Sequence, residues 1–391
     1  MIRNCFLCHG KVDNIFKSQW LLPGLPQTEI GYSVCMKCGS VCQSPALAPE
    51  KMDLYYRTTA VYTNPGREEA PSASKIRDVN EQVHFIERGM SRLPQSILQI
   101  GSSDGFTLSQ FKNAGVPEVM GIELSEAAIA IARRRYGVHS INANAETYQF
   151  ADSFELILLT HVLEHLYEPQ KLLQRCNKSQ CSLNEGFIYI EVPLLTDSNT
   201  LCPGFFTFEH TNYYNEFSLL KSLVLAGYTP ISIIKHLNSN LSPVIGVLAT
   251  TKKQGSFPIS TEPAEKNKTI LADYWNGEVE YWQSCVNSAM KLLQGPGNVY
   301  LWGAGIHTCQ LLANTTLLNA VPIAGLTDSS QIKWHMTQGN WECQPPTQID
   351  WQQGDKVIIS SFASQEEIYK SLQWLRDKGV ITLRLHPPIN R

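Results

Sequence analysis

Four cysteines near the start of the chain have the types and the spacing of a metal site. They form two Cys-x-x-Cys pairs, and a glycine follows each pair within two residues. The four candidate ligands are Cys5, Cys8, Cys35 and Cys38. Four thiolates complete the tetrahedral coordination of zinc and leave no open position, which favours a structural ion over a catalytic one. Two disulfides or four unrelated thiols are the alternatives, and His9 and Cys42 are expected to be bystanders.

A glycine-bounded turn is the second candidate site. An apolar run, 97–100, breaks at Gly101, and helical spacing resumes after Gly105, as in a strand, a tight turn and a helix start. Ligands of open α/β sheets bind at the carboxyl ends of the strands, and glycine lets backbone approach them closely. The turn does not match the dinucleotide fingerprint Gly-x-Gly-x-x-Gly, because Asp104 stands between its glycines. Without a pyrophosphate to bind, the turn suits a nucleoside with a charged amino-acid tail. Glu123 ends the next strand about twenty residues later, where an acid can hold both ribose hydroxyls.

Regular alternation of apolar runs and helical stretches positions these residues. Buried parallel strands read as short apolar runs, and alternation at this length predicts an α/β fold with a doubly wound sheet. The strands are expected at 97–101, 118–125, 139–141, 154–160 and 186–193, with a closing strand pair at 229–249. Helices are expected within 51–95, at 126–136 and at 217–227, and a long amphipathic helix at 270–293.

A second α/β unit is predicted from residue 298 onward. Its stretch 299–308 resembles a strand followed by a nucleotide-binding turn, and 323–328 is a second strand that ends in an acid. Thr308 stands where the third glycine of a dinucleotide fingerprint belongs, which argues against NAD. The predicted boundaries are 1–50 for the cysteine module, 51–249 for the central domain, 250–294 for a linker and bridging helix, and 295–391 for the C-terminal domain.

Composition excludes several function classes. The 391 residues carry a net charge of −3, so no basic surface indicates nucleic-acid binding, and Arg133 to Arg135 are expected at a solvated helix end. No run approaches the roughly 18 apolar residues of a membrane span, and the first residues lack the apolar core of a signal peptide. Eleven cysteines without an export signal favour metal and free thiols in a reducing cytoplasm.

These features together resemble a class I S-adenosylmethionine-dependent methyltransferase. The resemblance rests on the glycine turn with Asp104, on Glu123, and on the apolar strand that closes in Thr-His-Val-Leu-Glu-His at 160–165. A four-cysteine module, a central methyltransferase domain, a Glu-His loop and a C-terminal Rossmann-like α/β domain are, in that order, similar to the nucleotide-sugar C-methyltransferases. Those enzymes methylate C3 of 4-keto deoxysugars. The resemblance therefore implies S-adenosylmethionine, structural zinc and a small-molecule acceptor, most simply a nucleotide sugar.

The resemblance also implies a cofactor site. Its residues would be Gly101, Ser102, Asp104, Gly105, Glu123, Leu124, Asn144 and His161. The glycine turn would line the methionine part and Glu123 would hold the ribose. Asn144 would lie beside the adenine, and His161 would flank the sulfonium.

The catalytic residues would lie in the loop 201–214 and at the end of the fourth strand. Glu209 and His210 stand in place of the family's Glu-His pair. A histidine of near-neutral pKa can remove a proton from carbon beside a ketone or from a sugar hydroxyl. Glu209 would hold the tautomer of His210 or contact the sugar, His165 would stabilise an enolate oxygen, and Tyr214 completes the set.

The chain departs from this family at two places. Thr207 replaces the tyrosine that precedes the Glu-His pair, and no serine pair follows Tyr62. C-methylation of a nucleotide-linked sugar and O-methylation of a sugar or glycan hydroxyl therefore both stay open. An NAD-dependent oxidoreductase or epimerase working from the C-terminal domain, or a non-catalytic binding scaffold, are the alternatives from other classes.

Overall fold

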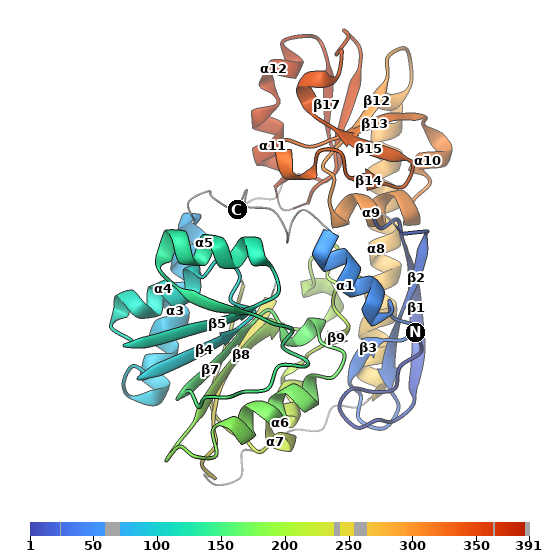
Figure 1. Ribbon diagram of the computed structural model, residues 1–391. Coiled ribbons are helices and arrows are strands. Elements are labelled where there is room, and N and C mark those ends of the chain that lie inside the picture. The colour runs from blue at the N-terminus through green and yellow to red at the C-terminus, as the bar shows by residue number, and fades with distance from the viewer. Residues whose placement is uncertain (24, 59–70, 238–242, 254–263, 363, 388–391) are drawn as a thin grey trace.

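The computed structural model describes residues 1–387, apart from 24, 59–70, 238–242, 254–263 and 363. Within these residues the strands form sheets of four, seven and six strands (Figure 1). Tyr62 and the middle of the predicted linker lie outside the described residues. No described helix combines the length and the apolar character that crossing a membrane requires.

The central sheet contains the predicted parallel strands. Its order is β10-β11-β8-β7-β4-β5-β6, in which β11 runs antiparallel to both of its neighbours. The strands are β4 (Ser96–Ile100), β5 (Glu118–Glu123), β6 (His139–Asn142), β7 (Leu156–Thr160), β8 (Phe187–Pro193), β10 (Thr229–Leu237) and β11 (Pro243–Thr250). The helices are α1 (Pro49–Thr58), α3 (Ala73–Met90), α4 (Phe106–Ala114), α5 (Glu126–Tyr136), α6 (Pro169–Ser179) and α7 (Glu216–Leu225), with short 3-10 turns η1 (Leu163–His165) and η2 (Ser198–Thr200). The α/β class predicted for this region is confirmed.

The inner strands are buried on both faces, as their unbroken apolar sequences predict. The side chains of Leu156 to Leu159 in β7 lie in two different apolar clusters, one on each side of the sheet. Alternate residues of one strand thus fill both cores, and the hydrophobic effect holds β7 at the centre of the domain.

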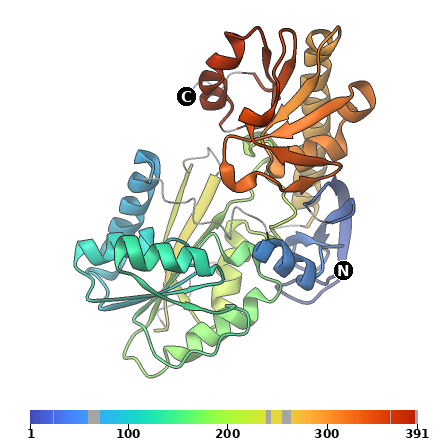
Figure 2. The same ribbon diagram turned by 45° about the horizontal axis from the view of Figure 1, so that its top comes forward.

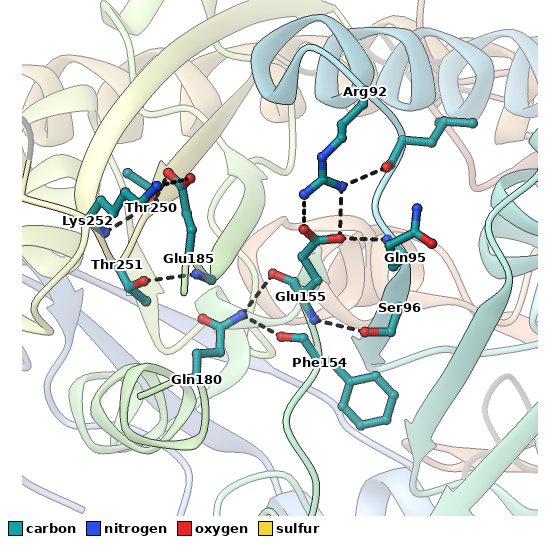
Figure 3. Close-up of polar contacts among 12 residues, drawn as sticks. Arg92, Gln95, Ser96, Phe154, Glu155, Gln180, Glu185, Thr250, Thr251 and Lys252 are labelled. Carbon is teal, nitrogen blue, oxygen red and sulfur yellow. Dashed lines mark hydrogen bonds and ion pairs between the residues drawn. The ribbon is translucent and has the colours of Figure 1, made fainter. Parts of the chain in front are cut away.

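Polar contacts tie together the amino-terminal edge of this sheet (Figure 3). The Glu155 carboxylate accepts hydrogen bonds from the Arg92 guanidinium and from the Gln95 backbone N–H at 2.6 Å. The Gln180 amide donates to the carbonyls of Phe154 and Glu155. Ligands bind at the opposite, carboxyl edge, so this cluster is structural support for the strands.

The amino-terminal module is a small antiparallel sheet with a strand from far along the chain. β1 (Val12–Trp20), β2 (Thr28–Cys35) and β3 (Val41–Gln43) pair in sequence, and β9 (Asn212–Tyr213) completes the order β1-β2-β3-β9. The module shares one apolar cluster with Phe206 and Phe208 of the loop 201–214 and with Tyr274. The predicted catalytic loop is therefore built onto the cysteine module.

The C-terminal domain holds a mainly parallel sheet in the order β14-β15-β13-β12-β16-β17. Its strands are β12 (Val299–Trp302), β13 (Ile323–Thr327), β14 (Thr337–Gln338), β15 (Trp341–Gln344), β16 (Lys356–Ile359) and β17 (Ile381–Arg384). Its helices are α9 (Ile306–Asn314), α10 (Leu317–Ala320), α11 (Gln365–Ser371) and α12 (Gln373–Arg376), with 3-10 turns η3 (Gln331–Lys333) and η4 (Pro346–Gln348).

Helix α8 (Ala264–Leu293) joins the parts of the molecule. It contacts β1, β2 and η2 along its length, and its last turns enter the core of the C-terminal domain. Figures 1 and 2 show it running beside the amino-terminal sheet up to the C-terminal domain. The Glu278 carboxylate of α8 accepts a hydrogen bond from the Gly204 backbone N–H at 3.0 Å, which fixes the loop 201–214 from a second side.

Candidate active site and metal centre

The four predicted cysteine ligands converge. All four Sγ atoms lie within 4.8 Å of one another; the Sγ atoms of Cys5 and Cys38 are 3.6 Å apart, and those of Cys8 and Cys35 are 3.4 Å apart. Tetrahedral zinc with Zn–S bonds of about 2.3 Å separates its sulfurs by about 3.8 Å. The thiols therefore stand near the positions that one zinc ion requires.

The backbone around each pair forms the same tight knuckle. The N–H of His9 donates to the Cys5 carbonyl at 3.0 Å, and the N–H of Gly39 donates to the Cys35 carbonyl at 2.9 Å. His9 and Gly39 both adopt positive φ, 56° and 74°. Among the described residues neither His9, which is exposed, nor Cys42, which lies in the core, joins the thiol group.

The glycine turn after β4 has the conformation that glycine favours. Gly101 and Gly105 have φ of 70° and 76°. A Cβ added at Gly101 would stand 2.5 Å from Val162 Cγ2, and one at Gly105 would stand 2.7 Å from the Ala132 side chain. The turn is thus pressed against the end of β7, where His161 and Val162 lie, and a larger residue would displace one of these surfaces.

Two polar residues of this turn differ in what they offer a ligand. The Ser102 hydroxyl is buried and hydrogen-bonded to the Ser140 hydroxyl at 3.0 Å, so this hydroxyl already has a partner within the protein. Asp104 accepts the Phe106 N–H at 3.2 Å at the start of α4, and its Oδ1 lies 3.8 Å from Lys75 Nζ. Lys75 belongs to α3 and carries no sequence motif that would have identified it.

Glu123 lies against the turn. Its carboxylate accepts backbone N–H groups of Ser103, Leu124 and Ser125 at 2.8 to 2.9 Å. A carboxylate has about four acceptor positions, so one remains for a ribose hydroxyl. Leu124 is 45% exposed beside it. The Asn144 side chain accepts the Glu146 N–H at 2.8 Å and forms a turn after β6, the neighbouring strand.

His161 stands between two carboxylates that were not among the predicted site residues. Its Nδ1 lies 3.4 Å from Glu164 Oε1 and its Nε2 lies 3.5 Å from Glu191 Oε1. Partial burial lowers the pKa of His161, but the two carboxylates outweigh it and raise the pKa to about 10. Glu191 lies in β8, two residues before the strand ends at Pro193, and its backbone carbonyl accepts the His161 N–H at 2.9 Å.

The Glu-His loop meets the end of β7 where two imidazoles, those of His165 and His210, lie close together. The rings of His165 and His210 are 4.8 Å apart and nearly perpendicular, at 81°. His165 Nδ1 contacts the Tyr56 hydroxyl at 2.9 Å and the Glu209 carbonyl at 3.2 Å. Tyr56 lies on α1, in the helical segment that precedes the glycine turn in the chain.

Three expectations about this loop are modified by the structure. Burial and the neighbouring imidazole of His165 lower the pKa of His210 to about 3, below the near-neutral value expected from the sequence. Glu209 offers its backbone carbonyl to His165, and its carboxylate acts electrostatically on Cys309 of α9. Tyr214 is buried and stacks edge-on against Phe6 of the cysteine module, with ring centroids 5.2 Å apart.

Comparison with known families accounts for the central region. The family model described as a methyltransferase domain matches residues 98–181. These residues lie within the seven-stranded sheet, and this part of the chain is similar to methyltransferase domains. The sheet, with its antiparallel strand between β8 and β10, has the class I S-adenosylmethionine-dependent methyltransferase fold.

Curated relatives of the methyltransferase domain are similar over a limited length. A ubiquinone biosynthesis O-methyltransferase of Aromatoleum aromaticum is 27% identical over 109 residues, which are 26% of this chain and 46% of that protein. Its counterpart in Pseudomonas fluorescens is 25% identical and covers 26% of this chain and 47% of its own length. The chain therefore spans about half the length of the curated relatives it matches.

A solved structure is similar over a longer stretch. The 1,6-didemethyltoxoflavin-N1-methyltransferase of Burkholderia thailandensis, with bound 1,6-didemethyltoxoflavin and S-adenosylhomocysteine, is 16% identical to this chain. The match covers 59% of this chain and 99% of that one, with a TM-score of 0.43.

The charges around His161 predict how stability of the methyltransferase domain changes with pH. Because the pKa of His161 is raised, the full contribution of His161 to the free energy of unfolding is present below the ordinary pKa near 6.5. This contribution is lost as the pH rises toward 10. Replacement His161→Gln is therefore expected to reduce the free energy of unfolding more at pH 6.5 than at pH 9.5. Urea unfolding of both proteins at the two pH values measures this, and an equal difference at both would contradict the pairing.

Proposed function

We propose that this protein transfers a methyl group from S-adenosylmethionine to a nucleotide-linked sugar or sugar-like small molecule, with His210 as the general base. One observation carries the proposal: a continuous chain of contacts joins the cofactor turn to the cluster of imidazoles formed by His161, His165 and His210. Glu123 bonds the turn at Ser103, Gly101 lies against Val162, and the adjacent His161 pairs with Glu164. The methyl donor and a proton acceptor would thus meet at one edge of the sheet.

The residues present fit S-adenosylmethionine. Gly101 and Gly105 keep the turn free of side chains, and Glu123 retains an acceptor position for the ribose. When bound, the cofactor supplies an electrophilic methyl group on a positively charged sulfur. The task left to the protein is alignment and one deprotonation. Buried Nδ1 of His210 has no hydrogen-bond partner among the described residues, and it is the candidate to receive the acceptor's proton.

We also propose that the four-cysteine cluster holds structural zinc. Support comes from four thiols within reach of one ion and from the paired knuckles. Thiolates that bind zinc must stay reduced, which fits a cytoplasmic protein.

The atom that receives the methyl group divides two versions of the proposal. The domain order and the Glu-His loop resemble nucleotide-sugar C-methyltransferases, which favours carbon. The O-methyltransferase names of the curated relatives favour a hydroxyl oxygen. In both versions the acceptor's electron pair forms the bond to the methyl carbon, the carbon–sulfur pair passes to sulfur, and the proton passes to the base.

Two observations argue against an NAD-dependent reaction in the C-terminal domain. Asp328, at the position of a ribose-binding acid, already accepts the Ala304 N–H and pairs with Lys333 Nζ, both at 2.8 Å. The Thr308 hydroxyl donates to the Gly303 carbonyl and so occupies the turn itself. Titration calorimetry separates the alternatives: we expect micromolar S-adenosylhomocysteine binding and none of NADH. The reverse result would overturn the proposal.

Removal of the base should affect turnover alone. His210→Ala is expected to lower the rate of methyl transfer at least 100-fold, the size of a general-base contribution, while S-adenosylhomocysteine affinity stays within about twofold. Turnover is measured as S-adenosylhomocysteine released with a panel of 4-keto and hydroxyl-bearing nucleotide sugars. The exposed His84 provides a matched control, His84→Ala, which should retain the full rate. A fully active His210→Ala enzyme would remove His210 from the mechanism.

A further inference from the structure

A buried carboxylate, that of Glu164, lies among the imidazoles of the proposed active site. Glu164, in η1, is 1% exposed, and neither carboxylate oxygen receives a hydrogen bond from the described residues. Its Oε1 lies 3.4 Å from His161 Nδ1 and 4.0 Å from His165 Nε2. Burying an ionised carboxylate is costly unless positive charge or donors surround it. The only described groups that face it in this way are imidazoles.

The contacts of His165 Nδ1 favour the tautomer in which Nδ1 carries the proton, and the other ring nitrogen, Nε2, faces the Glu164 carboxylate. The Glu209 carbonyl, 3.2 Å from His165 Nδ1, can only accept a hydrogen bond, whereas the Tyr56 hydroxyl can accept or donate. Both contacts are satisfied together when Nδ1 carries the proton. His165 Nε2 then points toward Glu164 Oε1, at 4.0 Å.

His210 needs an anion nearby if it is to act as a base. Burial and the charges of His165 and His161 disfavour its protonated form, whereas Glu164 is the carboxylate that favours it. One ligand atom from each of Glu164, His165 and His210 lies within 4.8 Å of the others. A positive charge formed on His210 would therefore stand beside the Glu164 carboxylate, which also faces His161.

We propose that Glu164 is the positioning residue that enables His210 to accept the acceptor's proton, because its carboxylate stabilises the imidazolium that forms. The inference rests on the proposed function and deepens it. It gives Glu164 the part that a carboxylate plays beside histidine in hydrolytic triads, where the acid stays ionised and the imidazole takes the proton. It also replaces Glu209, the residue that sequence alone suggested, as the carboxylate partner of the base.

Charge and shape are separated by three variants. Glu164→Gln keeps the size and removes the charge, and it is expected to lower the rate of methyl transfer by about 100-fold. Glu164→Asp keeps the charge and should recover at least a tenth of the wild-type rate. In Glu164→Ala, added sodium formate should restore turnover, whereas neutral formamide should not. Calorimetric affinity for S-adenosylhomocysteine, measured for all three, separates loss of the base from a change in the cofactor site, because Glu164 also pairs with His161.

A second experiment, the titration of His161, needs neither the methyl acceptor nor the cofactor. If Glu164 is ionised, its removal must lower the midpoint at which His161 titrates, and we expect Glu164→Gln to lower it by at least one pH unit. Proton NMR of the imidazole C–H signals between pH 6 and 10 measures this. The exposed Glu168 supplies the control Glu168→Gln, which should leave the midpoint unchanged.

The outcomes distinguish this inference from the proposed function. Absence of S-adenosylhomocysteine binding in the wild type would overturn the proposed function, whereas the titration of His161 would still test Glu164. An unmoved His161 midpoint, or full turnover in Glu164→Gln, would overturn the role of Glu164. If Glu164→Gln does not fold, loss of turnover in a folded Glu164→Asp would overturn it too. Metal analysis showing a second divalent ion bound at His210 would have the same consequence, because a coordinated nitrogen cannot accept a proton.

Discussion

Replacing Cys35 with serine is expected to abolish zinc binding and to disrupt the amino-terminal module. Structural zinc contributes about 10 to 16 kcal/mol of apparent binding free energy in isolated zinc-finger peptides, and this energy becomes folding energy. Cys35 ends β2, so its loss acts directly on the pairing of β2 with β3. Elemental analysis should fall from about one zinc per chain to below about a tenth, and thermal denaturation should show an early transition. The exposed Cys181 provides the control Cys181→Ser, which should keep its zinc.

The effect should reach the proposed active site because the module holds the loop that carries His210. β3 pairs with β9, two residues after His210, and the Arg3 guanidinium donates to the Thr211 carbonyl at 2.9 Å and to the Tyr167 carbonyl at 3.0 Å. Amide hydrogen exchange is therefore expected to increase at 207–214 as well as at 1–48 in Cys35→Ser. Zinc retained in this variant would contradict the metal site. Unchanged exchange at 207–214 would contradict the coupling.

Local features that sequence patterns describe well account for much of the fold. The apolar run of β7, the glycine turn and the acid at the end of β5 each depend on neighbours along the chain, and each was predicted at its observed place. The cysteine cluster is similar, because each knuckle is formed by a few consecutive residues. Patterns of this kind follow from strand periodicity and turn geometry, which are local properties.

The features that sequence did not predict depend on contacts between distant segments. β9 pairs with β3 across about 170 residues of chain, and nothing in Asn212 or Tyr213 specifies that partner. The low pKa of His210 follows from burial beneath groups of other elements. Glu164 was visible inside the strand-end motif, but its role depends on which imidazoles surround it. Periodicity states which residues are inside a domain, and it does not state which of them meet there.

Replacing Gly101 with valine is expected to abolish cofactor binding in a protein that remains folded. The φ of 70° at Gly101 is a genuine outlier for a β-branched residue and costs about 1 to 3 kcal/mol. The new Cβ would also stand 2.5 Å from Val162 Cγ2, so either the turn or the end of β7 must move. Both surfaces belong to the proposed cofactor site. We expect the dissociation constant of S-adenosylhomocysteine to increase at least about 100-fold, which corresponds to about 2.8 kcal/mol.

The control for this variant separates backbone strain from the clash. Gly115 also has a positive φ, 111°, but an added Cβ there would meet no atom within 4 Å. Gly115→Val should therefore lower the melting temperature through strain and leave S-adenosylhomocysteine affinity within about twofold. Calorimetry and thermal denaturation of both variants measure the two effects. Equal loss of affinity in both would assign it to general destabilisation, and full affinity in Gly101→Val would show that the turn is not where the cofactor binds. Loss confined to Gly101→Val would tie cofactor binding to the contact between the turn and Val162, and so to the strand end that also carries His161 and Glu164.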